Sequence, residues 1–158
     1  MNDFDDRKQA LLNAQERCAS WFLCIAGMTL VNTFLTLYTK SGFGFAVSLG
    51  VVHFANYLLA SKIAALGFSV LMAAVFAGFG WFARSGNIPV YTVGMVLYGL
   101  DGLILLLDKD WISIAVHAYI IYQLYTGVQH AGALKKLIAE EEADLRQQRI
   151  YNANAGQP

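Results

Sequence analysis

Residues 98–122 read YGLDGLILLLDKDWISIAVHAYIIY, and this stretch decides the fold that the sequence predicts. Two apolar runs flank a short DKD turn, and a single aspartate or histidine interrupts each run, Asp101 in the first and His117 in the second. Asp101 lies eight residues before Lys109, the middle of the turn, and His117 lies eight residues after it. Two antiparallel helices joined here would place both side chains at one depth, about 12 Å from the turn. The sequence therefore predicts a helical hairpin with an Asp–His contact inside it.

The composition is that of a membrane protein. Of the 158 residues, 57% are apolar and 14% are charged, and the mean hydropathy is +0.47. Soluble domains have roughly 45–50% apolar and about 25% charged residues. The apolar residues gather in five runs, at Ala19–Tyr38, Phe43–Ala60, Ile63–Ala83, Val90–Leu107 and Trp111–Ala131. Since about 20 helical residues cross a hydrocarbon core about 30 Å thick, we expect an all-α integral membrane protein.

Basic residues favour four spans over five, because cytoplasmic flanks are enriched in lysine and arginine. If residues 43–60 stay on the outer side as a short re-entrant or interfacial segment, eight of the eleven basic residues lie inside and three outside. If residues 43–60 cross, five lie inside and six outside, and the bias disappears. We therefore expect spans at about 19–38, 63–83, 90–107 and 111–131, with both termini cytoplasmic in an inner (plasma) membrane. A short fifth span remains the alternative, since eighteen residues make a helix of about 27 Å.

The chain on either side of the 19–131 transmembrane domain is more polar. Residues 1–18 predict an amphipathic helix lying in the membrane interface. Residues 132–150 predict a cytoplasmic helical extension, supported by Glu142 and Arg146 at an i,i+4 spacing. Residues 151–158 have no core-forming pattern and predict a disordered tail.

Two patterns predict how the spans pack. Small residues stand at every fourth position of the third run, at Ser61, Ala65, Ser69, Ala73 and Ala77. Such ridges are typical of close contact between helices in lipid. A polar face of the first run contains Thr29, Asn32, Thr33 and Thr36. Threonine hydroxyls commonly bond back to their own helix, so Asn32 is the member that we expect to contact another helix.

Most of the intramembrane polarity falls at one level. In the four-span topology the Asp101–His117 pair and the polar face of the first run both lie in the outer half of the bilayer, where the segment GVVHFANY adds further polar residues. An ionisable group inside the membrane costs at least about 2.5–3.5 kcal/mol on insertion scales and faces protein or water. The candidate ligand or proton site consists of Asp101, His117, His53, Asn32, Asn56 and Tyr98.

Several interpretations fit this cluster. In the first, a polar network fixes the packing of the helices without turnover, and Asp101→Asn with a retained hydrogen bond folds nearly as well as the wild type. In the second, Asp101 and His117 form a protonatable site for transport or ligand binding, open to the outer face. A metal site of two histidines and one carboxylate would add His53, and b-type haem would need His53 and His117. A Ser48–His117 dyad completes the alternatives.

Other motifs are missing. The sequence contains no HExxH, no GxSxG and no glycine-rich phosphate loop, so we expect no enzyme and no cofactor. The net charge is zero, which gives no basic surface for nucleic acid. Cys18 and Cys24 stand six apart in one run, which is neither a redox nor a metal spacing, and we expect them to pack.

Three strings resemble a group of small bacterial membrane proteins of unknown function: WFLCIAGMTLVN, VGMVLYGLDGLILLL and DWISIAVHAYIIYQLYTGVQ. The resemblance covers roughly residues 20–130. It implies that Asp101, Asp110, Trp111 and His117 belong to the recurring pattern of the group, and that His53 departs from it. It implies an architecture and no activity.

We therefore expect a four-span inner-membrane protein with a short outer segment. Its leading function is that of a non-enzymatic accessory or assembly protein with a structural Asp101–His117 pair. The alternative is a small-molecule or proton transport or binding protein that uses the same pair. The expected partners are the lipid bilayer and either a second copy of the chain or another membrane protein, and not nucleic acid.

Overall fold

The computed structural model describes residues 3–39, 47–59, 61–107 and 109–155, and within this part of the chain every element is a helix. The helices are α1 (Asp3–Thr39), α2 (Gly50–Leu58), α3 (Lys62–Arg84), α4 (Ile88–Leu107) and α5 (Trp111–Ala155). The predicted all-α fold class is confirmed. Three of them, α1, α3 and α4, are long and apolar enough to cross a membrane.

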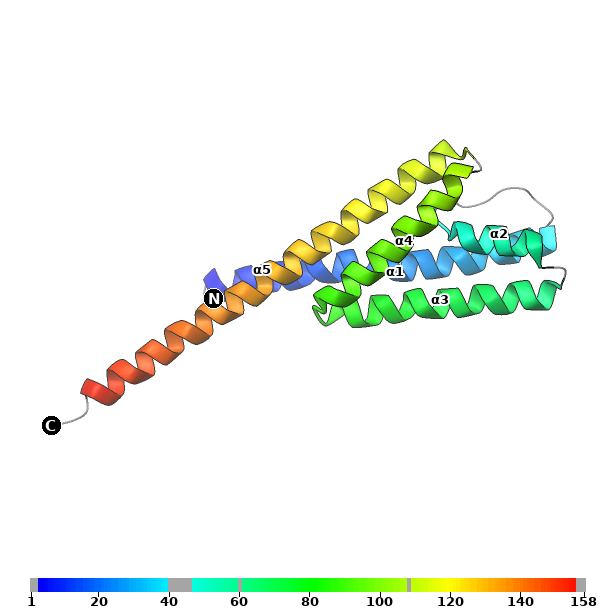
Figure 1. The fold of residues 1–158 in the computed structure, drawn as a ribbon. Helices are drawn as coiled ribbons and strands as arrows, with labels where there is room; N and C mark the ends of the chain where they lie inside the picture. The colour runs from blue at the N-terminus through cyan, green and yellow to red at the C-terminus, as the bar shows by residue number, and fades with distance from the viewer. Residues whose placement is uncertain (1–2, 40–46, 60, 108, 156–158) are drawn as a thin grey trace.

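The four long helices alternate in direction (Figure 1). α1 packs against α3 and α5, and α4 packs against α5. Near the start of α1, the Gln15 side-chain amide donates to the carbonyls of Ala83 and Arg84 at the end of α3, at 3.2 and 2.9 Å. At the opposite end, Lys62 Nζ donates to the Leu37 carbonyl at 3.2 Å. α1 and α3 are therefore antiparallel along their shared length.

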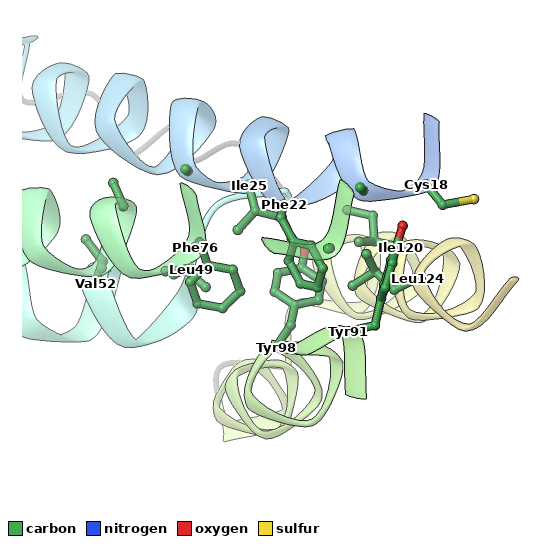
Figure 2. Packing of buried hydrophobic residues seen from close by; sticks show 14 residues of the cluster. Cys18, Phe22, Ile25, Leu49, Val52, Phe76, Tyr91, Tyr98, Ile120 and Leu124 are labelled. Atoms are coloured by element: carbon green, nitrogen blue, oxygen red, sulfur yellow. The ribbon is translucent and has the colours of Figure 1, made fainter. Parts of the chain in front are cut away.

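An aromatic cluster forms the core between these helices (Figure 2). The Phe22 ring centroid of α1 lies 6.3 Å from that of Phe76 and 6.0 Å from that of Phe79, both in α3. It lies 5.9 Å from the ring of Tyr91 in α4. Gly94 of α4 faces the Phe22 ring so closely that a Cβ there would come within 2.6 Å of a ring carbon. α4 and α1 reach this separation because residue 94 has no side chain.

The small-residue ridge of α3 faces α1, as the four-residue spacing predicts. Ala65, Ser69 and Ala73 are buried, and the hydroxyl oxygens of Thr33 and Ser69 lie 2.9 Å apart across the contact. Ser61 instead lies at the N-cap of α3, where its side chain accepts a backbone N–H. The centre of the ridge therefore allows close contact between α3 and α1, whereas its first residue, Ser61, caps the start of α3.

Two predicted boundaries do not coincide with the ends of helices. α1 is one helix from residue 3 to residue 39, and it is not divided at residue 18. No glycine or proline precedes Gly27, so nothing interrupts the helical hydrogen bonds between the polar end and the apolar run. α5 likewise continues to Ala155, so residues 151–155 are helical and not disordered. From residue 133 to 155 the sequence contains neither glycine nor proline.

The helix within the predicted apolar run of residues 43–60 is shorter than that run. This helix, α2, has nine residues and is about 13 Å long, which is less than half of the hydrocarbon thickness. Residues 40–46 and 60 lie outside the described residues. α2 packs against α3, α4 and α1, so it lies within the fold.

The contact at Gly94 predicts a difference between two glycine substitutions. Gly94→Ala should lower the free energy of unfolding of the detergent-solubilised protein by about 1–3 kcal/mol. The Phe22 ring is enclosed by other aromatic rings and cannot move away from the added methyl group. Gly27→Ala is the control, since a Cβ there meets nothing within 4 Å. Equal melting temperatures for the two variants would contradict the packing described.

Candidate functional site

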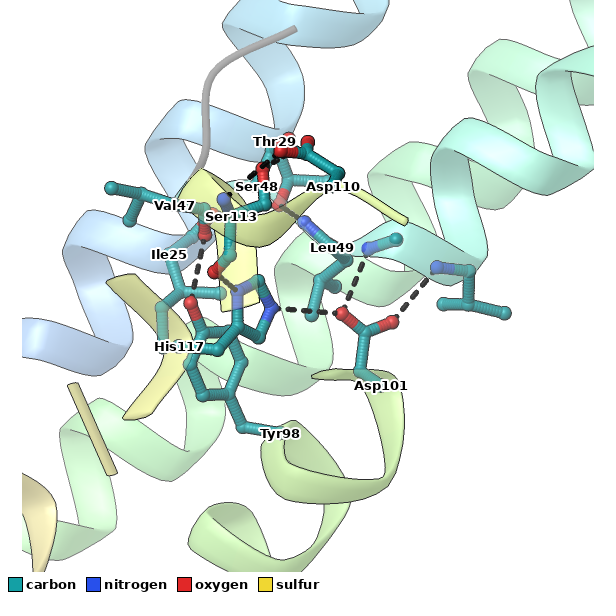
Figure 3. A network of polar contacts seen from close by, with 12 residues as sticks. Ile25, Thr29, Val47, Ser48, Leu49, Tyr98, Asp101, Asp110, Ser113 and His117 are labelled. Atoms are coloured by element: carbon teal, nitrogen blue, oxygen red, sulfur yellow. Dashed lines mark hydrogen bonds and ion pairs between the residues drawn. The ribbon is translucent and has the colours of Figure 1, made fainter. Parts of the chain in front are cut away.

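Asp101 of α4 and His117 of α5 are in contact, as the symmetric spacing about the DKD turn predicts (Figure 3). His117 Nε2 lies 3.3 Å from Asp101 Oδ2. The two side chains are 5% and 2% exposed respectively, so the contact is closed to the surroundings of the protein. α4 and α5 therefore form a hairpin that buries an acid–base pair between them.

The carboxylate of Asp101 also caps the N-terminus of α2. The backbone N–H of Gly50 donates to Oδ2 at 2.7 Å, and that of Val51 donates to Oδ1 at 2.8 Å. The first N–H groups of a helix have no partner within the helix, and the N-cap residue, Leu49, has no side chain that could supply one. Asp101, which belongs to α4, therefore takes the place of an N-cap side chain for α2. The carboxylate accepts the two N–H groups in charge-assisted hydrogen bonds.

The hydrogen bonds of His117 fix the net charge of the pair. His117 Nδ1 lies 2.9 Å from the carbonyl oxygen of Ser113, which can only accept, so Nδ1 carries a proton. A second proton must lie between Nε2 and Asp101 Oδ2, because two lone pairs facing each other would repel. This proton belongs either to an imidazolium beside a carboxylate or to a carboxylic acid beside a neutral imidazole. In both cases the pair has no net charge, which suits a buried position.

Tyr98 supports the pair from one turn earlier in α4. Its ring stacks on the imidazole of His117, with centroids 4.2 Å apart and an interplanar angle of 7°. Its hydroxyl donates to the carbonyl of Val47 at 3.2 Å. Tyr98 therefore both orients His117 and binds the backbone that leads into α2.

The polar face of α1 binds the next two residues of that backbone. The side-chain amide of Asn32 donates to Ser48 Oγ at 2.9 Å, and the backbone N–H of Leu49 donates to Thr29 Oγ1 at 3.2 Å. The sequence predicts that Asn32 contacts another helix, but Ser48 belongs to the non-helical segment before α2, and it is Thr33 of the same face that contacts a helix, at Ser69 of α3. Thr29 also bonds back to its own helix, at the carbonyl of Ile25, so its hydroxyl serves both purposes.

Residues 47–51 thus each form a hydrogen bond with a side chain of α1 or α4. Non-helical backbone inside a bilayer is tolerated only where protein or water satisfies its polar groups. The approach of α2 to α4 is close, since a Cβ on Gly50 would lie 2.9 Å from a methyl carbon of Leu105. The glycine lets the first N–H groups of α2 reach the carboxylate of Asp101.

A second cap supports the other side of the pair. Asp110 accepts from the backbone N–H of Ser113 at 3.2 Å and from its hydroxyl, which caps the start of α5. The hydroxyl and N–H of Ser113 hold the pKa of the Asp110 carboxyl below its ordinary value. The carbonyl of the same serine accepts from His117, so the turn between α4 and α5 sets the orientation of the imidazole.

The structure brings four of the six predicted site residues together around residues 47–51: Asp101, His117, Tyr98 and Asn32. His53 and Asn56 lie in α2, but their side chains are outside the described residues. Among the side chains that the structure describes, no group of three His, Cys, Asp or Glu residues could hold a metal ion. Cys18 and Cys24 are free, with Cys18 buried. Ser48 contacts Asn32.

The geometry revises the expectation for Asp101→Asn. An asparagine amide has one acceptor oxygen and one donor nitrogen, whereas both oxygens of Asp101 accept backbone N–H groups. The amide nitrogen would therefore face an N–H of α2. The sequence did not predict this effect of the substitution, because the partners of Asp101 are backbone N–H groups. Gly50 was the one residue that could have indicated a close approach to the backbone there.

Comparisons with known protein families, with curated proteins and with solved structures found no match to this chain.

The contact between α1 and the backbone of Leu49 predicts that Thr29→Val destabilises the protein. Valine keeps the shape but leaves a buried N–H without an acceptor, which should lower the free energy of unfolding by about 1–3 kcal/mol. Thr92→Val is the matched control, because the Thr92 hydroxyl is exposed and bonds only back to its own helix at Ile88. Thermal unfolding in detergent measures both. A Thr29→Val protein as stable as the control would contradict the role given to Thr29.

Proposed function

We propose that this chain is a multi-pass protein of the bacterial inner membrane that acts as a non-enzymatic accessory or assembly protein. The observation that carries the proposal is that Asp101 and His117 hydrogen-bond to each other and to the backbone of the fold. Ionisable groups inside a membrane commonly mark ion or substrate pathways. Here both carboxylate oxygens and both ring nitrogens have protein partners, in a neutral pair that holds α2 in place.

In the proposed topology, α1, α3, α4 and the first part of α5, residues 111–131, form a four-helix bundle of spans. α2 is a re-entrant helix whose N-terminus lies inside the outer half of the membrane. The shortness of α2 and the alternating directions of the long helices support this arrangement. Both termini are then cytoplasmic, in agreement with the eight basic residues that fall on that side. The resemblance to small bacterial membrane proteins supports the assignment to a bacterial membrane.

The proposed partner is a membrane protein, either another copy or a different chain. α5 continues well beyond the other helices at its C-terminal end (Figure 1). This extension is polar and exposed, and Glu142 and Arg146 form an exposed i,i+4 pair on it at 3.9 Å. Apolar side chains also stand exposed on it, at Leu145, Ile150 and Tyr151. A charged helix with exposed apolar side chains is suited to binding a protein at the membrane surface.

Transport is the second candidate, and one observation favours it. A broken helix whose N-terminus ends at membrane depth beside a protonatable group is a feature of transporter binding sites. If the proton between His117 and Asp101 exchanged with solvent, the same pair would serve as a proton relay. The two candidates differ in what Asp101 is needed for, which is the position of α2 in the first and flux in the second.

The test compares stability with flux. Wild type, Asp101→Asn and the control Asp144→Asn, at an exposed position of the α5 extension, are reconstituted in liposomes with an internal pH-sensitive dye and an imposed potential. We expect no wild-type proton flux above that of empty liposomes. We also expect Asp101→Asn alone to lose about 1–3 kcal/mol of stability, because one N–H of α2 loses its acceptor. Wild-type flux that Asp101→Asn abolishes without a change in melting temperature would establish transport instead.

A further inference from the structure

A groove of about 500 Å³ lies between α1 and α5, away from the Asp101–His117 pair. It occupies the end of the molecule where Gln15 contacts the last residues of α3, which is the cytoplasmic end in the proposed topology. Arg17 and His130 line one end of the groove, toward the polar extensions of both helices. Trp21 and Tyr119 line the other end, deeper along the apolar run.

The positive charge of Arg17 at the polar end of the groove has no acidic side chain beside it in the described groove lining. Among the described residues that line the groove, none is an aspartate or a glutamate. Arg17 is exposed, and within the described part of the chain it has no carboxylate at salt-bridge distance. Lys135 and Lys136 follow His130 by about one and a half helical turns on the same helix. An anionic group at the mouth of the groove would meet the positive charge of Arg17 on the α1 wall, and the two lysines further along α5 add positive charge at longer range.

The deeper part of the groove is aromatic. The rings of Trp21 and Tyr119 meet edge to face with centroids 5.8 Å apart, and the Tyr119 hydroxyl accepts from the side-chain amide of Gln123 at 2.8 Å. Tyr122 adds a third ring to the wall. Trp21 follows Arg17 by one turn, about 6 Å along the helix axis. Aromatic rings at this depth lie where lipid headgroups meet acyl chains.

We propose that this groove binds an anionic phospholipid of the surrounding bilayer. The lipid phosphate pairs with the guanidinium of Arg17, with His130 on the opposite wall, and the upper part of the acyl chains lies along Trp21, Tyr119 and Tyr122. Cationic pockets between helices on the cytoplasmic side are a known mode of lipid headgroup binding. The inference rests on the membrane insertion proposed above and is independent of whether Asp101 is structural or carries protons.

The fluorescence of Trp21 tests the proposal. Trp81 and Trp111 are both exposed, so Trp81→Phe with Trp111→Phe leaves Trp21 as the single reporter. The full-length protein is reconstituted in phosphatidylcholine with a small fraction of lipid brominated on its acyl chains, as phosphatidylglycerol or as phosphatidylcholine. Bromine quenches tryptophan on contact. We expect about five-fold stronger enrichment of phosphatidylglycerol at Trp21, corresponding to about one arginine–headgroup attraction.

Two arginine variants distinguish lipid binding in the groove from a general attraction of anionic lipid to the positive charge at that end of the protein. Arg17→Gln should abolish the preference for phosphatidylglycerol, whereas Arg84→Gln, which removes a cation at the same end but outside the groove, should keep it. Added inorganic phosphate should leave the preference unchanged. Equal quenching by both lipids, or an equal loss in the two arginine variants, would overturn the proposal. Failure of membrane insertion would be recognised separately, because neither brominated lipid would then quench Trp21.

Discussion

The two hydrogen bonds from the start of α2 to Asp101 are the constraint on which the rest of the site depends. The N–H groups of Gly50 and Val51 begin a helix inside the protein, where the N-cap residue Leu49 has no side chain that could accept them. A carboxylate is the one side chain that offers two acceptor oxygens and no donor, so it can accept both N–H groups at once. Burying that carboxylate then requires a cationic or proton-sharing partner, and His117 supplies it.

The remaining polar residues follow from the same requirement. The Ser113 carbonyl accepts from Nδ1 of His117, so that Nε2 faces Asp101. Tyr98 stacks on the imidazole ring and hydrogen-bonds to the chain before α2. Thr29 accepts the next N–H along that chain. Each of these side chains would be unfavourable alone in an apolar interior, and together they satisfy one another and an irregular piece of backbone. The polar cluster is therefore explained by the short helix that it holds.

The sequence predicts the parts of this arrangement that depend on spacing. Equal distances from the DKD turn brought Asp101 opposite His117, and the four-residue repeat placed Ser69 against α1. The capping of α2 was not predictable in the same way, because every residue except proline has a backbone N–H, which gives no pattern. The continuity of α1 through residue 18 was missed for a related reason, since a change from polar to apolar residues alters what a helix faces without ending it.

Hydrogen exchange at the start of α2 tests the central claim most directly. The measurement compares amide exchange of residues 47–58 in wild type, Asp101→Asn and Asp144→Asn, in detergent or lipid nanodiscs. If Asp101 holds α2, its loss lowers the local opening free energy by about 1–3 kcal/mol, and exchange at Gly50 and Val51 rises by roughly five-fold or more while α3 stays protected. Exchange that is unchanged at these two amides, or that rises equally throughout the protein, would contradict the account.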